Sequence, residues 1–116
     1  MARVFTIYVM CENNESAMHL ATSLVNEKLV ACANVKSGVR SLYLWEGSLQ
    51  LDEEYNVIMK TSEDVLNQAI DRIKELHHYD IPCITAWPVE AGDVDYLDWV
   101  NGQVSQPVDD TLQKTA

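Results

Sequence analysis

Basic residues are scarce in this sequence, and cysteines are few. Eight Lys and Arg stand against 18 Asp and Glu, so the formal net charge is −10 at pH 7. Because nucleic-acid phosphates require a basic surface, this charge argues against a nucleic-acid partner. The three cysteines are odd in number and scattered, which excludes a disulfide framework. A reducing cytoplasm is therefore the expected location.

Long apolar runs and enzyme signatures are also missing. No run is long enough to span a bilayer, and the N-terminus leads directly into a strand pattern, so we expect neither a membrane segment nor a signal peptide. The sequence has no Gly-rich phosphate loop, no G-x-S-x-G and no H-E-x-x-H, and we predict that the chain is not an enzyme. Its 116 residues, 47% of them hydrophobic, are enough for one folded domain.

The most informative stretch runs from Val35 to Thr61. Apolar and aromatic residues alternate with a period of two in both halves, which indicates two strands. Between them lies Trp45–Ser48, where Gly47 can take a positive φ. The pattern predicts a long β-hairpin with a bulge or bend at Ser37–Gly38. Arms longer than their own sheet leave N–H and C=O groups that another chain can pair with.

Five further elements flank the hairpin. A strand, two helices, a strand and a short helix are predicted, in this order, at Val4–Met10, Ala17–Leu29, Leu66–Leu76, Cys83–Trp87 and Asp93–Val100. Cys11–Asn14 offers N-cap residues for the first helix, and Thr61 with Asp64 resembles a capping box for the second. Asn101–Gly102 is expected to end the third helix.

The order of elements is β-α-β-β-α-β followed by a helix, which predicts an α+β, ferredoxin-like sandwich over residues 1–102. Residues 103–116 are expected to form a polar, loosely held tail. Two helices cover only one face of a four-stranded sheet. Because the other face keeps apolar residues, we expect subunits to associate through it and through the long hairpin.

Several short runs carry a resemblance to a known family. They are, in order, Ala31–Asn34, Ser41–Gly47, Ile58–Thr61, His77–Pro82 and Gly92–Trp99. In sequence and spacing they resemble the CutA family of divalent-cation tolerance proteins, over about Val4 to Gln103. The resemblance implies a ferredoxin-like subunit, a tight homotrimer, and a link to copper and other divalent metals.

Three residues are candidate metal ligands. Cys11 ends the first predicted strand, where the resembled family has a proposed copper ligand, and His77 matches its His-Pro-Tyr motif. His78 stands where that motif has proline. Cysteine and histidine suit copper or zinc and not magnesium or calcium. The alternatives are a buried structural thiol and a histidine pair that caps a helix.

Five residues belong, by the same resemblance, to an intersubunit ligand cleft: Trp45, Glu46, Lys60, Tyr79 and Cys83. Aromatic residues such as Trp45 and Tyr79 suit an interface. Lys60 could hold an anion or a carboxylate, although a lysine at a strand edge is more often only protective charge. Many family members have an acid at the position of Cys83, and a thiol there favours softer metals.

Three functions are compatible with these residues. The first is a cytosolic homotrimer that binds copper or another divalent metal ion weakly and exchangeably and supports metal tolerance. The second is a trimeric small-ligand sensor that uses its intersubunit clefts. The third is a weak hydrolase with a Cys11–His77 pair, which requires a closeness that sequence does not show. We predict the first, with the sensor as the alternative.

Overall fold

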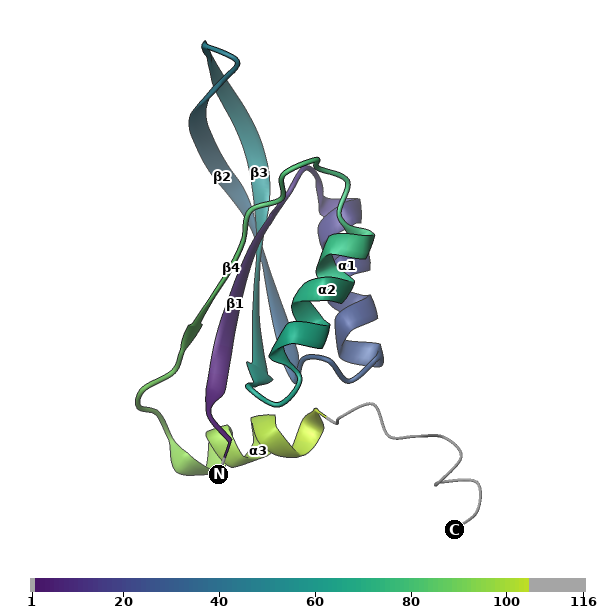
Figure 1. Ribbon diagram of the computed structural model, residues 1–116, viewed down its shortest axis with the longest axis vertical. Coiled ribbons are helices and arrows are strands. Elements are labelled where there is room, and N and C mark those ends of the chain that lie inside the picture. The colour runs from purple at the N-terminus through teal and green to yellow at the C-terminus, as the bar shows by residue number, and fades with distance from the viewer. Residues whose placement is uncertain (1, 105–116) are drawn as a thin grey trace.

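The computed structural model of the chain describes residues 2–104, and it has the predicted ferredoxin-like order (Figure 1). Four antiparallel strands form one sheet in the spatial order β2-β3-β1-β4. The elements are β1 (Val4–Cys11), α1 (Asn14–Asn26), β2 (Cys32–Trp45), β3 (Ser48–Ser62), α2 (Leu66–Leu76), β4 (Ile84–Pro88) and α3 (Val94–Gln103).

The predicted hairpin is confirmed as β2 and β3, which have 14 and 15 residues. The two-residue turn Glu46–Gly47 joins them, and both residues have positive φ, of 50° and 80°. This is the backbone that closes a tight hairpin and that glycine adopts without strain. The predicted bulge is also present, because the register shifts between Lys36 and Val39, where Gly38 has a φ of 78°.

The hairpin extends well beyond the rest of the sheet (Figure 1). β1 pairs with β3 only from Tyr55 to Ser62, so the outer part of β3 pairs with β2 alone. Cross-strand partners place four leucines on one face of this projection, and each is more than 60% exposed: Leu42, Leu44, Leu49 and Leu51. The opposite face carries Tyr43 and Trp45.

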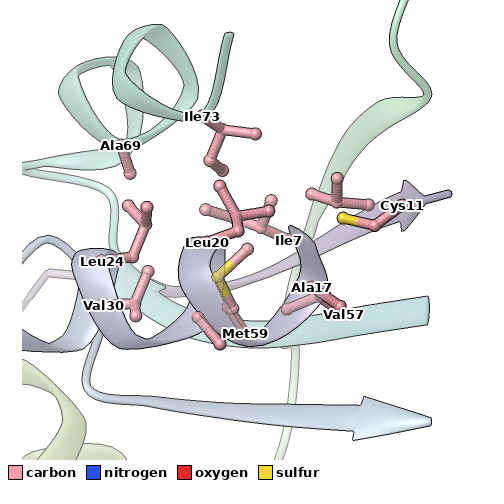
Figure 2. Close-up of a cluster of buried hydrophobic side chains, with 12 residues drawn as sticks. Ile7, Cys11, Ala17, Leu20, Leu24, Val30, Val57, Met59, Ala69 and Ile73 are labelled. Atoms are coloured by element: carbon pink, nitrogen blue, oxygen red, sulfur yellow. The ribbon is translucent and has the colours of Figure 1, made fainter. Parts of the chain in front are cut away.

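The core lies between the sheet and the two helices that cover one face of it, α1 and α2 (Figures 1 and 2). Alternate residues of β1 and β3, such as Ile7 and Met59, meet the apolar stripe of α1 and the inner side of α2. Asn13 caps α1 as predicted, because its side chain accepts a hydrogen bond of 2.8 Å from the backbone N–H of Ser16.

The bounds of α2, Leu66–Leu76, are as predicted, but its predicted capping box and the predicted end of α1 are wrong. Thr61 is fully buried in β3, and its hydroxyl donates to the carbonyl oxygen of Leu29 at 2.6 Å. The predicted capping box is therefore absent, and α2 begins after Val65, which makes no side-chain cap bond. Leu29 lies beyond the end of α1, since Lys28 has a positive φ of 60° and turns the chain.

Helix α3 also differs from the prediction. It continues through Asn101 and Gly102 to Gln103, so these residues do not end it. The amide of Asn101 instead donates to the carbonyl oxygen of Ala2 at 3.0 Å and holds α3 against the start of the chain. Strand β4 is the outer strand beside β1, a position that tolerates the proline at its end, Pro88.

Other expectations have a simpler outcome. The three cysteines are free thiols. None of the helices within residues 2–104 is long and apolar enough to cross a membrane. Except for its first two residues, the predicted polar tail at 103–116 lies outside the residues that the structure describes.

The core makes a direct prediction for stability. Ile73 is fully buried between α2 and the sheet, whereas Ile81 is 75% exposed. Ile73→Ala should lower the free energy of unfolding by about 2–5 kcal/mol, because it removes packed atoms and leaves a cavity. Ile81→Ala should change it by less than about 0.5 kcal/mol. Urea unfolding at one fixed protein concentration measures both, and equal effects would contradict the described core.

Candidate functional site

Two adjoining hollows lie where α2 ends. The smaller, which we call the inner hollow, has a free volume of about 10 Å³ and lies between the end of β1, the start of α1 and the end of α2. This is on the order of the space that one water molecule needs. The larger, the outer cleft, has a volume of about 550 Å³ and lies between the hairpin and the segment after α2. His78 and Tyr79 line both.

His77 joins α2 to β1. Its Nε2 lies 2.5 Å from the carbonyl oxygen of Met10, and its Nδ1 lies 3.1 Å from the backbone nitrogen of Tyr79. A carbonyl oxygen only accepts, so Nε2 carries the proton and Nδ1 accepts from the Tyr79 N–H. Both ring nitrogens are therefore engaged. A metal ion reaches either one only if a hydrogen bond within the chain is broken.

Cys11 lies at the end of β1, and its side chain is at one end of the core cluster (Figure 2). It lines the inner hollow together with His77 and His78, so one chain brings the three predicted metal ligands to the same place. Burial raises the pKa of the Cys11 thiol to about 11, and the nearby carboxylates of Glu54 and Glu12 add to the rise. The thiol is thus protonated at neutral pH, and it is a poor nucleophile.

His78 differs from these two residues because it is exposed, and its ring bonds to none of the residues between 2 and 104. Over the same range, no group of three or more His, Cys, Asp or Glu side chains is arranged to hold a metal ion. A single subunit therefore offers one ready imidazole at the inner hollow, and two more donors that must first give up a proton or a hydrogen bond.

The outer cleft is built around a buried carboxylate. Glu54 is only 7% exposed, and its Oε2 accepts a hydrogen bond of 2.8 Å from the hydroxyl of Tyr79. The register of the hairpin places Glu54 opposite Val39, on the same face as Tyr43 and Trp45. These two aromatic residues form the hairpin side of the cleft.

Negative charge dominates the electrostatics of the outer cleft. Burial and the hydrogen bond to Glu54 raise the pKa of Tyr79. Burial also raises the pKa of the exposed Cys83 thiol, and the charge of Glu54 raises it further. Both groups are therefore neutral at physiological pH, and the acidic lining residues of the cleft are Glu54 and Asp80, beside the imidazole of His78.

The residues predicted for the ligand cleft separate into two groups. Trp45, Tyr79 and Cys83 line the outer cleft. Glu46 lies in the hairpin turn, and Lys60 lies near the other end of the sheet, paired with Thr6 and Cys32, so neither lines the cleft of the single chain.

Sequence reasoning missed Glu54, the most buried polar group of the cleft. It belongs to an acidic run at 52–54, which is typical of a solvated surface. A signal was nevertheless present. The period of two in β3 puts residue 54 on the same face as Asn56, which lies on the central part of the sheet and is 4% exposed.

The raised pKa of Cys11 predicts a specific pH dependence of stability. The pKa of the Cys11 thiol is about 11 in the folded chain and near 9.0 when the thiol is exposed. Burial of the neutral thiol therefore contributes fully to the free energy of unfolding below pH 9, and this contribution is lost as the pH rises to 11. Two pKa units correspond to at most about 3 kcal/mol, and solvent screening reduces this effect. Urea unfolding of wild type and Cys11→Ala from pH 8 to 11 should show wild type losing stability relative to the variant. A difference that is independent of pH would contradict the prediction.

Comparison with known proteins agrees with this fold. Residues 5–103 match the family described as CutA1 divalent ion tolerance protein. The divalent-cation tolerance protein CutA of Pyrococcus horikoshii is 40% identical over 94 residues, which cover 81% of this chain and 91% of that protein. Protein CutA 1, chloroplastic, of rice is 38% identical over 100 residues, which cover 86% of this chain and 56% of that protein. The chain thus spans about half the length of the plant relatives that it matches.

Solved structures give the same result. The crystal structure of CutA1 from Oryza sativa superposes with a TM-score of 0.88 at 36% identity, and the match covers 90% of this chain and 96% of that one. The sequence resemblance is therefore confirmed by the family match, by relatives above 30% identity and by the fold. The chain belongs to the CutA1 divalent ion tolerance protein family.

Proposed function

We propose that this chain is a divalent-cation tolerance protein that assembles as a homotrimer and binds copper, or a similar transition-metal ion, at the inner hollow. One observation carries the proposal. Cys11, His77 and His78 line a single hollow in a chain whose relatives are named for divalent-cation tolerance. A reducing compartment is part of the proposal, because Cys11, Cys32 and Cys83 are free thiols.

The donor atoms fit a transition metal. A thiol and two imidazoles are soft to borderline ligands, which suit copper or zinc, whereas magnesium and calcium prefer oxygen. The hollow includes one carboxylate, from Glu12, and this is too few for an oxygen cage. Copper or zinc would thus be held by His78 first, with Cys11 and His77 as the further ligands.

The state of these ligands argues for weak binding. Cys11 must lose a proton that burial retains, and His77 must lose one of its two hydrogen bonds. Each change costs free energy that a bound ion has to offset. The core is packed from apolar side chains and includes neither histidine, so the bound ion would be cargo and not a structural ion. Such a site suits exchangeable binding.

The hairpin supports the proposed assembly. Its outer part has unpaired strand edges, and its four leucines are exposed on one face. Long exposed edges and apolar faces are liabilities in a monomer. Burying each leucine would contribute about 1.5–3 kcal/mol. Neighbouring copies that cover the hairpin would also bring further ligands within reach of a hollow that one subunit leaves incomplete.

The proposed assembly can be tested by its mass. Light scattering of wild type at micromolar concentration should give three times the 13.1 kDa mass of the chain. Leu42→Glu/Leu51→Glu changes two cross-strand partners and should dissociate the assembly, because it places charge in an apolar interface. Val94→Glu, a matched change at a 65% exposed residue outside the hairpin, should leave the mass unchanged. A monodisperse wild-type monomer would refute the trimer.

The proposed metal site can be tested by titration. In calorimetric titrations with Cu(II) and Zn(II), wild type should bind both ions, and Cys11→Ser and His77→Ala/His78→Ala should each bind at least tenfold more weakly. Since His78 is the ready ligand, His78→Ala alone should lose more affinity than His77→Gln.

Two controls accompany these titrations. His19→Ala removes an exposed histidine from the middle of α1 and should bind as wild type does. Magnesium should not bind. Should both ligand variants retain wild-type affinity, Cys11 and the histidine pair are structural, and the metal site proposed at the inner hollow is wrong.

A further inference from the structure

Glu54 is a buried carboxylate without a cation. It is 7% exposed, and among residues 2–104 it takes part in no ion pair. Tyr79 donates to Oε2, and no described residue donates to Oε1. Of the side-chain oxygens and nitrogens of the described residues, only Oδ1 of Asn101 is both buried and unpaired, so Oε1 of Glu54 is open to the cleft that Glu54 lines. A cation that enters the cleft can therefore reach this oxygen.

The walls of the outer cleft indicate what kind of counter-ion this is. Three aromatic side chains line it, from Tyr43, Trp45 and Tyr79, and no Lys or Arg of the described chain does. Aromatic faces attract ammonium and guanidinium groups, most strongly where water is excluded. The volume of about 550 Å³ lies within the range of roughly 300–1,000 Å³ that is usual for small-molecule sites.

The local field favours the same sign of charge. Glu54 raises the pKa of both Tyr79 and Cys83, and Asp52 accepts a hydrogen bond from the hydroxyl of Tyr43. The chain as a whole has a formal charge of −10. An anionic metabolite would enter against this field, whereas a cation would be drawn toward it.

We propose that the outer cleft binds a small organic cation, a primary ammonium or guanidinium group on a short carbon chain. Glu54 is its counter-ion, held in place by the hydroxyl of Tyr79. Trp45 and Tyr43 contact the carbon chain and the charged group. This site goes beyond the proposed metal function and does not rest on it, because it uses neither Cys11 nor His77.

A metal ion is a poorer occupant of the outer cleft. Glu54, His78 and Cys83 all line it, and here, as at the inner hollow, no three such side chains within residues 2–104 are placed to share one ion. A metal would also leave the aromatic walls without a role. The other source of positive charge is a Lys or Arg side chain of a second copy, and the experiment separates this case.

The test uses the native, assembled chain and four small molecules of similar length. Calorimetric titrations are run with 1,4-diaminobutane and agmatine, with 1,4-butanediol as a neutral analogue and succinate as an anion. The two amines should bind in a saturable way at submillimolar concentration. Butanediol and succinate should bind at least tenfold more weakly, because Glu54 pairs with neither.

Three variants locate the site. Glu54→Gln keeps the shape of the side chain and should weaken amine binding at least tenfold. Glu53→Gln is the matched control, since residue 53 is exposed, pairs across the strand with Arg40 and lies on the other face of the hairpin; it should bind as wild type does. Trp45→Leu changes an exposed wall residue and should weaken binding several-fold, which keeps the test decisive if Glu54→Gln folds poorly.

Two results would overturn the proposal. One is amine binding that is absent at millimolar concentration in wild type, or unchanged in both Glu54→Gln and Trp45→Leu. The other is a combined result in which wild type binds no amine and Glu54→Gln changes the mass of the assembly. This result would show that the counter-ion of Glu54 is a basic side chain of a neighbouring copy. Metal titrations of Glu54→Gln should change far less than those of Cys11→Ser, because Glu54 reaches the inner hollow only indirectly, through Tyr79 and His77. Failure of this site and failure of the inner hollow are therefore distinguishable.

Discussion

The structure depends on a mismatch in length between two paired strands. β3 has fifteen residues and its neighbour β1 has eight, so half of β3 has a partner on one side only. The paired half forms the centre of the sheet and carries the core. The other half, with β2, projects away from it (Figure 1). The exposed leucines and the aromatic wall of the outer cleft both exist because the hairpin continues where the sheet ends.

Much of this architecture could be predicted because it depends on local pattern. Alternation with a period of two predicted the hairpin, and Gly47 predicted the turn, since few other residues accept its backbone conformation. The order of elements then led to the ferredoxin-like sandwich, which leaves one sheet face without helices. The errors occur where a distant contact overrides a local preference. Thr61 has the chemistry of a helix cap, but it is used to satisfy the carbonyl of Leu29, 32 residues away.

The candidate site was predictable in its residue types but not in its chemical state. Cysteine and histidine are common transition-metal ligands, and the structure does bring Cys11 and the two histidines to one hollow. That His77 is engaged at both nitrogens depends on Met10, 67 residues away. The importance of Glu54 depends on the hydrogen bond that it accepts from Tyr79, 25 residues away. Neither fact has a local signature, because both arise from which segments meet.

The bonds around His77 also connect the two hollows. Its ring links Met10 to Tyr79, and Tyr79 in turn holds Glu54. A ligand that takes Nδ1 of His77 removes the acceptor of the Tyr79 N–H, and so changes the free energy of placing the carboxylate in the outer cleft. Thermodynamic linkage makes this coupling reciprocal. If one ligand changes the affinity for the other by some factor, the second ligand changes the affinity for the first by the same factor. If the two proposed ligands bind, their affinities are coupled through this one imidazole.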